Sequence, residues 1–259
     1  MQFLEIISID PADPVSFTFF TGYMAMLAAS VFFFMERSRV ADEWKLSMLV
    51  SGLITGIAAV HYYYMRDYYQ GAMDFNADLT DAMKAMGTKP MDTHPISLRY
   101  IDWTLTVPLM CVEFYLITKK AGGTSGLLWR LIIASVAMLL LGYIGEAFYN
   151  TPETKNESWM YGALSGLAYF YIVWMVWKGE VATLAANAGG KVQSAVKALG
   201  WFVLVGWAIY PIGYIAGTEG GLFGVPMFQN LEMDLVYNIG DAINKIGFGL
   251  VIYALATKD

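Results

Sequence analysis

Long uncharged runs of hydrophobic residues recur along the chain, and charged residues gather in the shorter segments between them. An α-helix needs about 20 mostly apolar residues to cross the hydrocarbon core of a bilayer. The pattern meets this requirement seven times, and it predicts membrane-spanning helices at approximately 15–37, 45–66, 97–119, 126–149, 157–180, 192–217 and 230–257. We therefore expect an all-α fold, in which residues 1–259 form one domain, a seven-transmembrane-helix bundle.

The connections between these spans are mostly short, which favours an antiparallel bundle of consecutive neighbours. The exception is the segment 66–95, which is rich in Asp, Met and Gly. It is longer than a simple turn requires, so we expect it to hold a small hairpin or a surface flap.

Composition supports a polytopic membrane protein in contact with lipid. Hydrophobic residues make up 57% of the chain and charged residues only 15%, whereas a soluble domain carries about 25% charged residues. The net charge of −6 argues against a nucleic-acid partner. With one cysteine, Cys111, and two histidines, a disulfide framework and a Cys- or His-based metal site are excluded. The start of the chain has no basic segment of the kind that opens a cleavable signal peptide.

The distribution of basic residues predicts the orientation in the membrane. Ten lysines and arginines fall on one side of the predicted spans and four on the other, while Arg99 and Lys245 lie within spans. Because cytoplasmic loops carry the excess of positive charge, the N-terminus is expected outside and the C-terminus in the cytoplasm.

The last span contains a lysine, Lys245, with Asp241 one helical turn earlier on the same face. An ammonium group at membrane depth costs several kcal/mol, so it must be paired, neutralised or used. Lysine also condenses with carbonyl compounds to form a Schiff base. A purely structural Lys–Asp pair that holds the bundle together is the alternative interpretation.

Four polar residues share one face of the third span. Counted at about 100° per residue, Arg99, Thr106 and Glu113 all point in nearly the same direction as Asp102, and the two carboxylates lie about 16 Å apart along the helix. Carboxylates at intervals along an inward face are typical of a proton path. Glu113 has an apolar setting near the cytoplasmic end, so we expect it to be protonated, as a proton donor must be. Arg99 is expected to pair with Asp102 or Asp241.

The alternative for this face is a buried salt-bridge network, with Glu113 reaching toward the interface. Three charges on one face, together with a separate Asp–Lys helix, favour the proton path.

Three segments together resemble a known family: R-Y-I-D-W-T-L-T-V-P-L in the third span, G-W-A-I-Y-P-I-G-Y in the sixth and G-D-A-I-N-K in the seventh. They are similar to microbial (type 1) rhodopsins, and most of all to proteorhodopsin and xanthorhodopsin-like light-driven proton pumps of the marine flavobacterial type. The resemblance extends span for span over nearly the whole chain.

The resemblance implies that Lys245 holds all-trans retinal as a protonated Schiff base, with Asp102 and Asp241 as its counterions. Asp102 would accept the proton after illumination, and Glu113 would resupply it from the cytoplasmic side. Thr106 would be the small polar residue between acceptor and donor. Sodium- and chloride-pumping relatives replace these carboxylates, so the resemblance implies an outward pump for H+, a photochemical transporter rather than an enzyme, in the bacterial inner membrane.

Aromatic residues are expected to line the retinal. The resemblance assigns this role to Trp103, Tyr169, Trp207, Tyr210 and Pro211, because flat rings restrict which bond isomerises and supply dispersion contacts. An aromatic bundle core or an interfacial belt is the alternative.

Three further residues take roles from the resemblance. Met110 matches the colour-tuning position, where an apolar side chain indicates absorption of green light. His61 is expected to hydrogen-bond Asp102, although a lone histidine on an apolar face is commonly structural. Gly162 matches a glycine that opens a window for a carotenoid antenna in xanthorhodopsin-like members, and its alternative role is close helix packing.

The sequence does not identify the proton-release group, the oligomeric state or a role for every histidine. Glu146, Glu219 and Glu232 are candidates for a proton-release group, and no motif selects among them, while His94 in the 66–95 segment receives no role. The resemblance suggests a homo-oligomer, a pentamer or hexamer. A photosensory rhodopsin that signals through a partner protein is the alternative function, although sensors commonly lack a donor such as Glu113. A seven-helix transporter without a chromophore is the third possibility.

Overall fold

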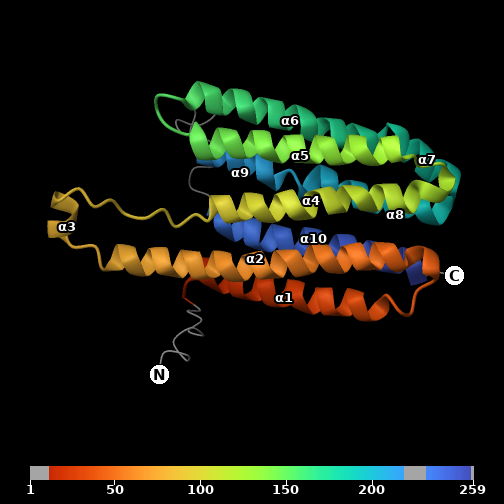
Figure 1. Ribbon diagram of the computed structural model, residues 1–259, viewed down its shortest axis with the longest axis horizontal. Helices are drawn as coiled ribbons and strands as arrows, with labels where there is room; N and C mark the ends of the chain where they lie inside the picture. The colour runs from red at the N-terminus through yellow and green to blue at the C-terminus, as the bar shows by residue number, and fades with distance from the viewer. Residues whose placement is uncertain (1–11, 219–231, 258–259) are drawn as a thin grey trace.

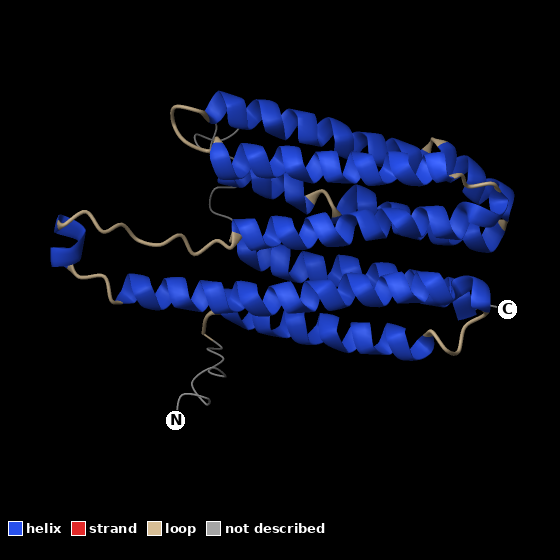
Figure 2. Cartoon of the chain, in the orientation of Figure 1, coloured by secondary structure: helices blue, strands red, loops and turns tan. Residues whose placement is uncertain are grey.

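The computed structural model describes residues 12–218 and 232–257, and every regular element in these ranges is helical (Figure 2). Seven helical stretches are long and apolar enough to cross a membrane. They run roughly parallel to the long axis of the molecule, with α1 beginning and α10 ending at opposite ends of it (Figure 1). The predicted fold class, an all-α bundle of seven spanning helices, is confirmed.

The first four stretches are formed mainly by single helices, and the fifth and sixth are each divided. The helices are α1 (Pro14–Glu36), α2 (Lys45–Ala77), α3 (Asp81–Ala85), α4 (Ile96–Thr118), α5 (Ser125–Phe148), α6 (Lys155–Trp177), α7 (Glu180–Ala188), α8 (Gly190–Trp201), α9 (Ile209–Gly217) and α10 (Met233–Thr257). Short 3-10 turns precede α2 and follow α4.

Local signals at the helix ends agree with these boundaries. Asp13 precedes α1, and its carboxylate accepts hydrogen bonds from the backbone N–H groups of Val15 and Ser16 at 2.9 and 3.2 Å. Pro14 follows as the first helical residue, where its missing N–H costs nothing. Thr124 caps α5 in the same way, through the N–H of Leu127. Such caps satisfy backbone donors that the helix itself leaves without partners.

Helices α1 and α2 pack closely because small residues lie at their contact. A Cβ at Gly52 would lie 2.7 Å from the ring of Phe34, and one at Gly56 would lie 2.8 Å from the Ser30 hydroxyl. That hydroxyl donates a hydrogen bond of 2.8 Å to the carbonyl of Gly52. Glycines four residues apart thus let two spanning helices approach, as is common inside membranes.

The sixth stretch is interrupted by a π-helical segment, Phe202–Gly206, between α8 and α9. The N–H of Trp207 accordingly bonds the carbonyl of Phe202, five residues back, at 2.9 Å. The side chain of Asn244 on α10 donates to the carbonyl of Gly206 at 3.0 Å. Irregular segments of this kind often mark functional sites, and this one directly precedes Trp207, Tyr210 and Pro211.

The 66–95 segment differs in form from a hairpin. Helix α2 continues to Ala77, the one-turn helix α3 follows, and the chain returns without regular structure, so that an arm projects beyond one end of the bundle (Figure 1). Asn76 and Met91 exchange two hydrogen bonds, 2.8 and 2.7 Å long, which fasten the returning chain to α2. The arm ends at His94 and Pro95, and α4 begins at Ile96.

The outer faces of the bundle are apolar. Large hydrophobic side chains such as Ile133, Leu167 and Phe170 are more than half exposed, and soluble proteins rarely expose so many of them together. The charged residues at the centres of α4 and α10 are buried instead. This distribution suits a bundle that is surrounded by lipid and keeps its polar groups inside.

Candidate functional site

The amine of Lys245 lies between two carboxylates in the interior of the bundle. Its Nζ is 2.9 Å from Oδ2 of Asp102 on α4 and 3.1 Å from Oδ1 of Asp241 on α10. All three side chains are almost completely buried. The i, i+4 spacing in α10 places Asp241 beside the lysine, and the opposing helix α4 supplies the second charge. One buried cation thus faces two anions, which leaves the group as a whole negatively charged.

The two carboxylates differ in how many hydrogen bonds they receive. Asp241 accepts hydrogen bonds from the hydroxyl of Tyr62 at 2.7 Å, the indole N–H of Trp103 at 3.1 Å and the hydroxyl of Tyr210. Asp102 bonds the lysine through Oδ2, while its Oδ1 has no hydrogen-bond partner. A carboxylate that accepts three hydrogen bonds is stabilised in its ionised form, whereas Asp102 has an oxygen beside the lysine that accepts no hydrogen bond.

His61 and Thr106 lie next to Asp102 without bonding its carboxylate. The imidazole Nδ1 of His61 is 3.8 Å from Oδ1 of Asp102, too far for a hydrogen bond, and bonds the carbonyl of Ile57 at 2.9 Å. The hydroxyl of Thr106 donates to the backbone carbonyl of Asp102 at 2.9 Å. The expected hydrogen bond between His61 and Asp102 is therefore not formed in this structure, although the ring stands beside the free oxygen.

Arg99 does not pair with Asp102 or Asp241, and the expectation from the sequence is wrong on this point. Its Nε and one terminal nitrogen donate to Oδ1 of Asp234 at 3.1 and 2.7 Å. The same terminal nitrogen donates to Asn238 at 2.8 Å. The guanidinium thus bonds a carboxylate that lies about two helical turns before Asp241 on α10.

Glu113 lies alone on the other side of Lys245, at the α4 end predicted to be cytoplasmic. It is fully buried, its Oε1 accepts a hydrogen bond of 3.1 Å from the hydroxyl of Ser51, and its Oε2 has no partner. Among the ion pairs of the described residues, none includes Glu113. A buried carboxylate without a cation is costly, so the side chain suits a stored proton.

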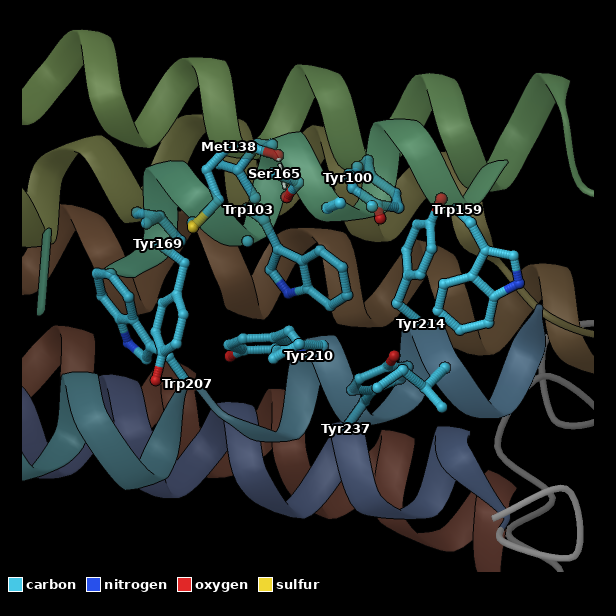
Figure 3. A pocket seen from close by; sticks show the side chains of 18 residues that line it. Tyr100, Trp103, Met138, Trp159, Ser165, Tyr169, Trp207, Tyr210, Tyr214 and Tyr237 are labelled. Atoms are coloured by element: carbon cyan, nitrogen blue, oxygen red, sulfur yellow. Dashed lines mark hydrogen bonds between the residues drawn. The ribbon is translucent and has the colours of Figure 1, made fainter. Parts of the chain in front are cut away.

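A cavity of about 410 Å³ lies beside the charged group, a volume in the range of small-molecule sites. The cavity wall includes the five residues expected to line retinal, Trp103, Tyr169, Trp207, Tyr210 and Pro211, and also Gly162. Figure 3 shows the rings of Trp103 and Tyr210 between those of Trp207 and Tyr237. The rings of Trp103 and Tyr210 also hydrogen-bond Asp241, so they join the cavity to the charged group. Met110 is buried but is not part of this wall.

Gly162 is in close contact with the ring of Tyr214. A Cβ there would lie 2.6 Å from the ring Cε1 atom, so a side chain would displace the ring. The hydroxyl of Tyr214 donates to the carbonyl of Ser158 at 2.6 Å and fixes the ring in this position. Figure 3 shows this ring beside Trp159 at the cavity. Close packing therefore accounts for the glycine, which also forms part of the cavity wall.

A second, more polar cavity of about 320 Å³ lies at the end of the bundle from which the arm projects. Its wall includes His94, Arg99, Glu146 and Asp234. Of the three glutamates considered for proton release, Glu146 accepts a hydrogen bond of 2.7 Å from Tyr100, Glu232 is exposed, and Glu219 lies outside the described residues.

Sequence reasoning missed four residues that contact the charged groups. Asp234 was detectable, because it lies two helical turns before Asp241 on the same face of α10. Tyr62, Ser51 and His94 were not, because each reaches its partner from another segment of the chain, as the bonds Tyr62–Asp241, Ser51–Glu113 and His94–Asp234 show.

These observations define a polytopic membrane protein with a buried lysine, two counter-charges and an aromatic cavity. A family model described as bacteriorhodopsin-like protein matches residues 13–259, and the chain belongs to this family. It is 38% identical over 252 residues to a green-light absorbing proteorhodopsin from the gamma-proteobacterium EBAC31A08, which covers 97% of this chain and 90% of that protein. The resemblance inferred from the three segments is confirmed.

Solved structures give the same result. The crystal structure of Exiguobacterium sibiricum rhodopsin superimposes with a TM-score of 0.72 at 31% identity, covering 93% of this chain and 95% of that one. Xanthorhodopsin, described as a light-driven ion pump with dual chromophore, gives a TM-score of 0.74 at 26% identity, covering 96% and 95%.

Proposed function

We propose that this protein is a light-driven outward proton pump of the bacterial cytoplasmic membrane that uses all-trans retinal bound covalently to Lys245. One observation carries the proposal: the buried lysine amine lies between Asp241, which accepts three other hydrogen bonds, and Asp102, which has a free oxygen. The similarity to a proteorhodopsin over nearly the whole chain supports it.

The residues present fit the chromophore. The amine of Lys245 provides the covalent attachment, the free oxygen of Asp102 gives an acceptor beside it, and the aromatic cavity provides a hydrophobic site of suitable volume. When bound, retinal supplies absorption of visible light and an isomerisation that changes the surroundings of the lysine nitrogen.

In the proposed cycle, Asp102 takes the proton from Nζ of Lys245. Asp241 stays ionised because its three donors stabilise the charged form, so the two carboxylates have separate roles. His61, whose Nδ1 is 3.8 Å from the free oxygen of Asp102, is placed to interact with that group once it is protonated. The proton leaves Lys245 toward the end of the bundle that carries the arm.

Glu113 then returns a proton to Nζ of Lys245. It lies eleven residues after Asp102 in α4, about 16 Å along the helix and toward the opposite end. Burial without a cation favours its neutral form, and Ser51 holds one of its oxygens. Acceptor and donor on opposite sides of the lysine give the transport its direction, from the cytoplasm to the outside.

Two finer parts of the proposal concern assembly and a second chromophore. A homo-oligomer, a pentamer or hexamer, remains a prediction. A carotenoid antenna beside Gly162 gains support from the dual chromophore of xanthorhodopsin, but here the ring of Tyr214 contacts the glycine and would have to move. A carotenoid band in the excitation spectrum of retinal fluorescence would establish the antenna.

The pumping proposal is tested in cells that express the protein and are supplied with all-trans retinal. Illumination should acidify the medium, and a protonophore should abolish the change. A coloured protein without acidification would indicate a photosensor. A protein that forms no visible band with retinal would indicate a transporter without a chromophore.

A further inference from the structure

His94 lies at the end of an unbroken chain of polar contacts that starts at the buried lysine. Asp241, 3.1 Å from Nζ of Lys245, accepts a hydrogen bond from Tyr62, whose hydroxyl in turn accepts one from Arg99 at 3.4 Å. Arg99 donates to Oδ1 of Asp234, and the other oxygen of Asp234 is 2.6 Å from Nδ1 of the imidazole. The chain connects the proton-transfer group with the surface of the bundle.

Exposure changes abruptly at the last link. The side chains of Arg99 and Asp234 are 3% and 5% exposed, whereas that of His94 is 54% exposed. The imidazole is therefore the point at which the chain meets solvent. The cavity of about 320 Å³, whose wall includes His94, Arg99 and Trp103, runs alongside and is large and polar enough to hold water.

We propose that His94 is the outer proton-exchange group of the pump, a relay residue that passes each transported proton from the Arg99–Asp234 pair and its cavity to the external medium. This inference rests on the proposed function and adds the exit step to it. In that step an N–H bond of the imidazolium breaks and its proton goes to bulk water. The neutral imidazole is then protonated again by the proton that Asp102 releases, so one proton leaves per cycle.

The charges around His94 favour its protonated form at rest. Asp234 on α10, which accepts the Nδ1–H, is the main reason that the pKa of His94 lies above its ordinary value, and Asp92 in the same loop acts in the same direction. Arg99 on α4 opposes this, and Glu146 on α5 faces the same cavity. The pKa of His94 therefore lies above the ordinary value of a histidine, and the cause is its contact with the Asp234 carboxylate.

The first experiment follows the released proton with a soluble pH dye after a laser flash on the retinal-loaded protein. In His94→Gln the side chain can still donate a hydrogen bond to Asp234 but cannot titrate. We expect the proton to appear in the medium about tenfold later, relative to deprotonation of the lysine nitrogen, because a positioned acid is lost. In the unmodified protein the delay should depend on pH around the pKa of His94, and the variant should lose this dependence. Lys89→Gln, an exposed change in the same arm, is the matched control.

The second experiment uses the fact that the chain has only two histidines. In protein labelled with ¹⁵N-histidine, the NMR signal that disappears in His94→Gln should titrate above the ordinary value and respond to illumination. A residue that is merely structural would keep a constant protonation state through the cycle.

The outcomes separate this inference from the pumping proposal. If His94→Gln releases protons with the timing and pH profile of the unmodified protein, the relay is wrong while the pump stands. If the unmodified protein forms no visible band or releases no proton, the proposed function itself fails, and the relay with it.

Discussion

The two halves of the bundle on either side of Lys245 are built differently. On the side of the arm, Tyr62, Arg99 and Asp234 continue the hydrogen-bonded contacts from the lysine to the surface. On the other side, no hydrogen bond in the described part of the chain joins Glu113 to Lys245 or Asp102, and the fully buried apolar residues there include Phe114 and Phe248.

This difference suggests how a single bundle moves protons in one direction. In the proposed cycle, the polar contacts on the side of the arm offer the proton a route toward the surface after Asp102 has taken it. An isolated acid in apolar surroundings can deliver its proton only when the site changes, so it opposes backflow.

The largest effect is expected for Lys245→Ala, which removes the proposed attachment point for retinal between the two halves. Without the amine, added all-trans retinal should give no visible absorption band in the purified protein. Lys178→Ala, a change at an exposed lysine, should leave the band intact. A visible band of normal intensity in the Lys245 variant would contradict the attachment site.

Asp102→Asn removes the proposed proton acceptor at the start of the exit half. We expect pumping to stop and the absorption maximum to move to longer wavelength, because a negative charge beside the lysine nitrogen stabilises the ground state. The measurements are an absorption spectrum and acidification by illuminated cells. Continued acidification would assign the acceptor role to another residue.

Glu113→Gln tests the uptake half alone. The amide keeps the shape and the hydrogen bond to Ser51 but has no proton to give, so return of the proton to the lysine nitrogen should slow by a factor of about 100 or more. The absorption maximum should stay within a few nanometres, since the residue is far from the lysine. Flash spectroscopy measures the rate, and turnover at the normal rate would exclude Glu113 as donor.

The sequence was sufficient for the parts of this architecture that depend on one helix at a time. Apolar runs gave the number of spans, and helical periodicity placed Asp241 beside Lys245 and Asp102 on one face with Glu113. The membrane makes such inferences unusually direct, because a charged residue inside a span must have a partner or a role.

Contacts between helices were harder to predict, because they depend on how far each helix is shifted and rotated relative to its neighbours. Arg99 was expected beside the inner carboxylates. The axial position of α10 relative to α4 instead places Asp234 next to the guanidinium. His94 reaches the same carboxylate only because α2 extends into an arm and the chain returns to the bundle. No periodicity in the sequence indicates such a return.

The smallest effect is expected for Ser51→Ala, which alters the uptake half without removing its acid. The Ser51 hydroxyl donates to Oε1 of Glu113 at 3.1 Å, and this hydrogen bond stabilises the carboxylate that remains after the proton has left. Losing it costs about 1 kcal/mol, so the return of the proton should slow by about fivefold.

Thr55→Val is the matched control, because the Thr55 hydroxyl is buried on the same helix but bonds only backbone carbonyls. Equal rates in the two variants would show that Ser51 is only a packing residue, whereas a slower rate in Ser51→Ala alone would show that Glu113 depends on the hydrogen bond from the Ser51 hydroxyl.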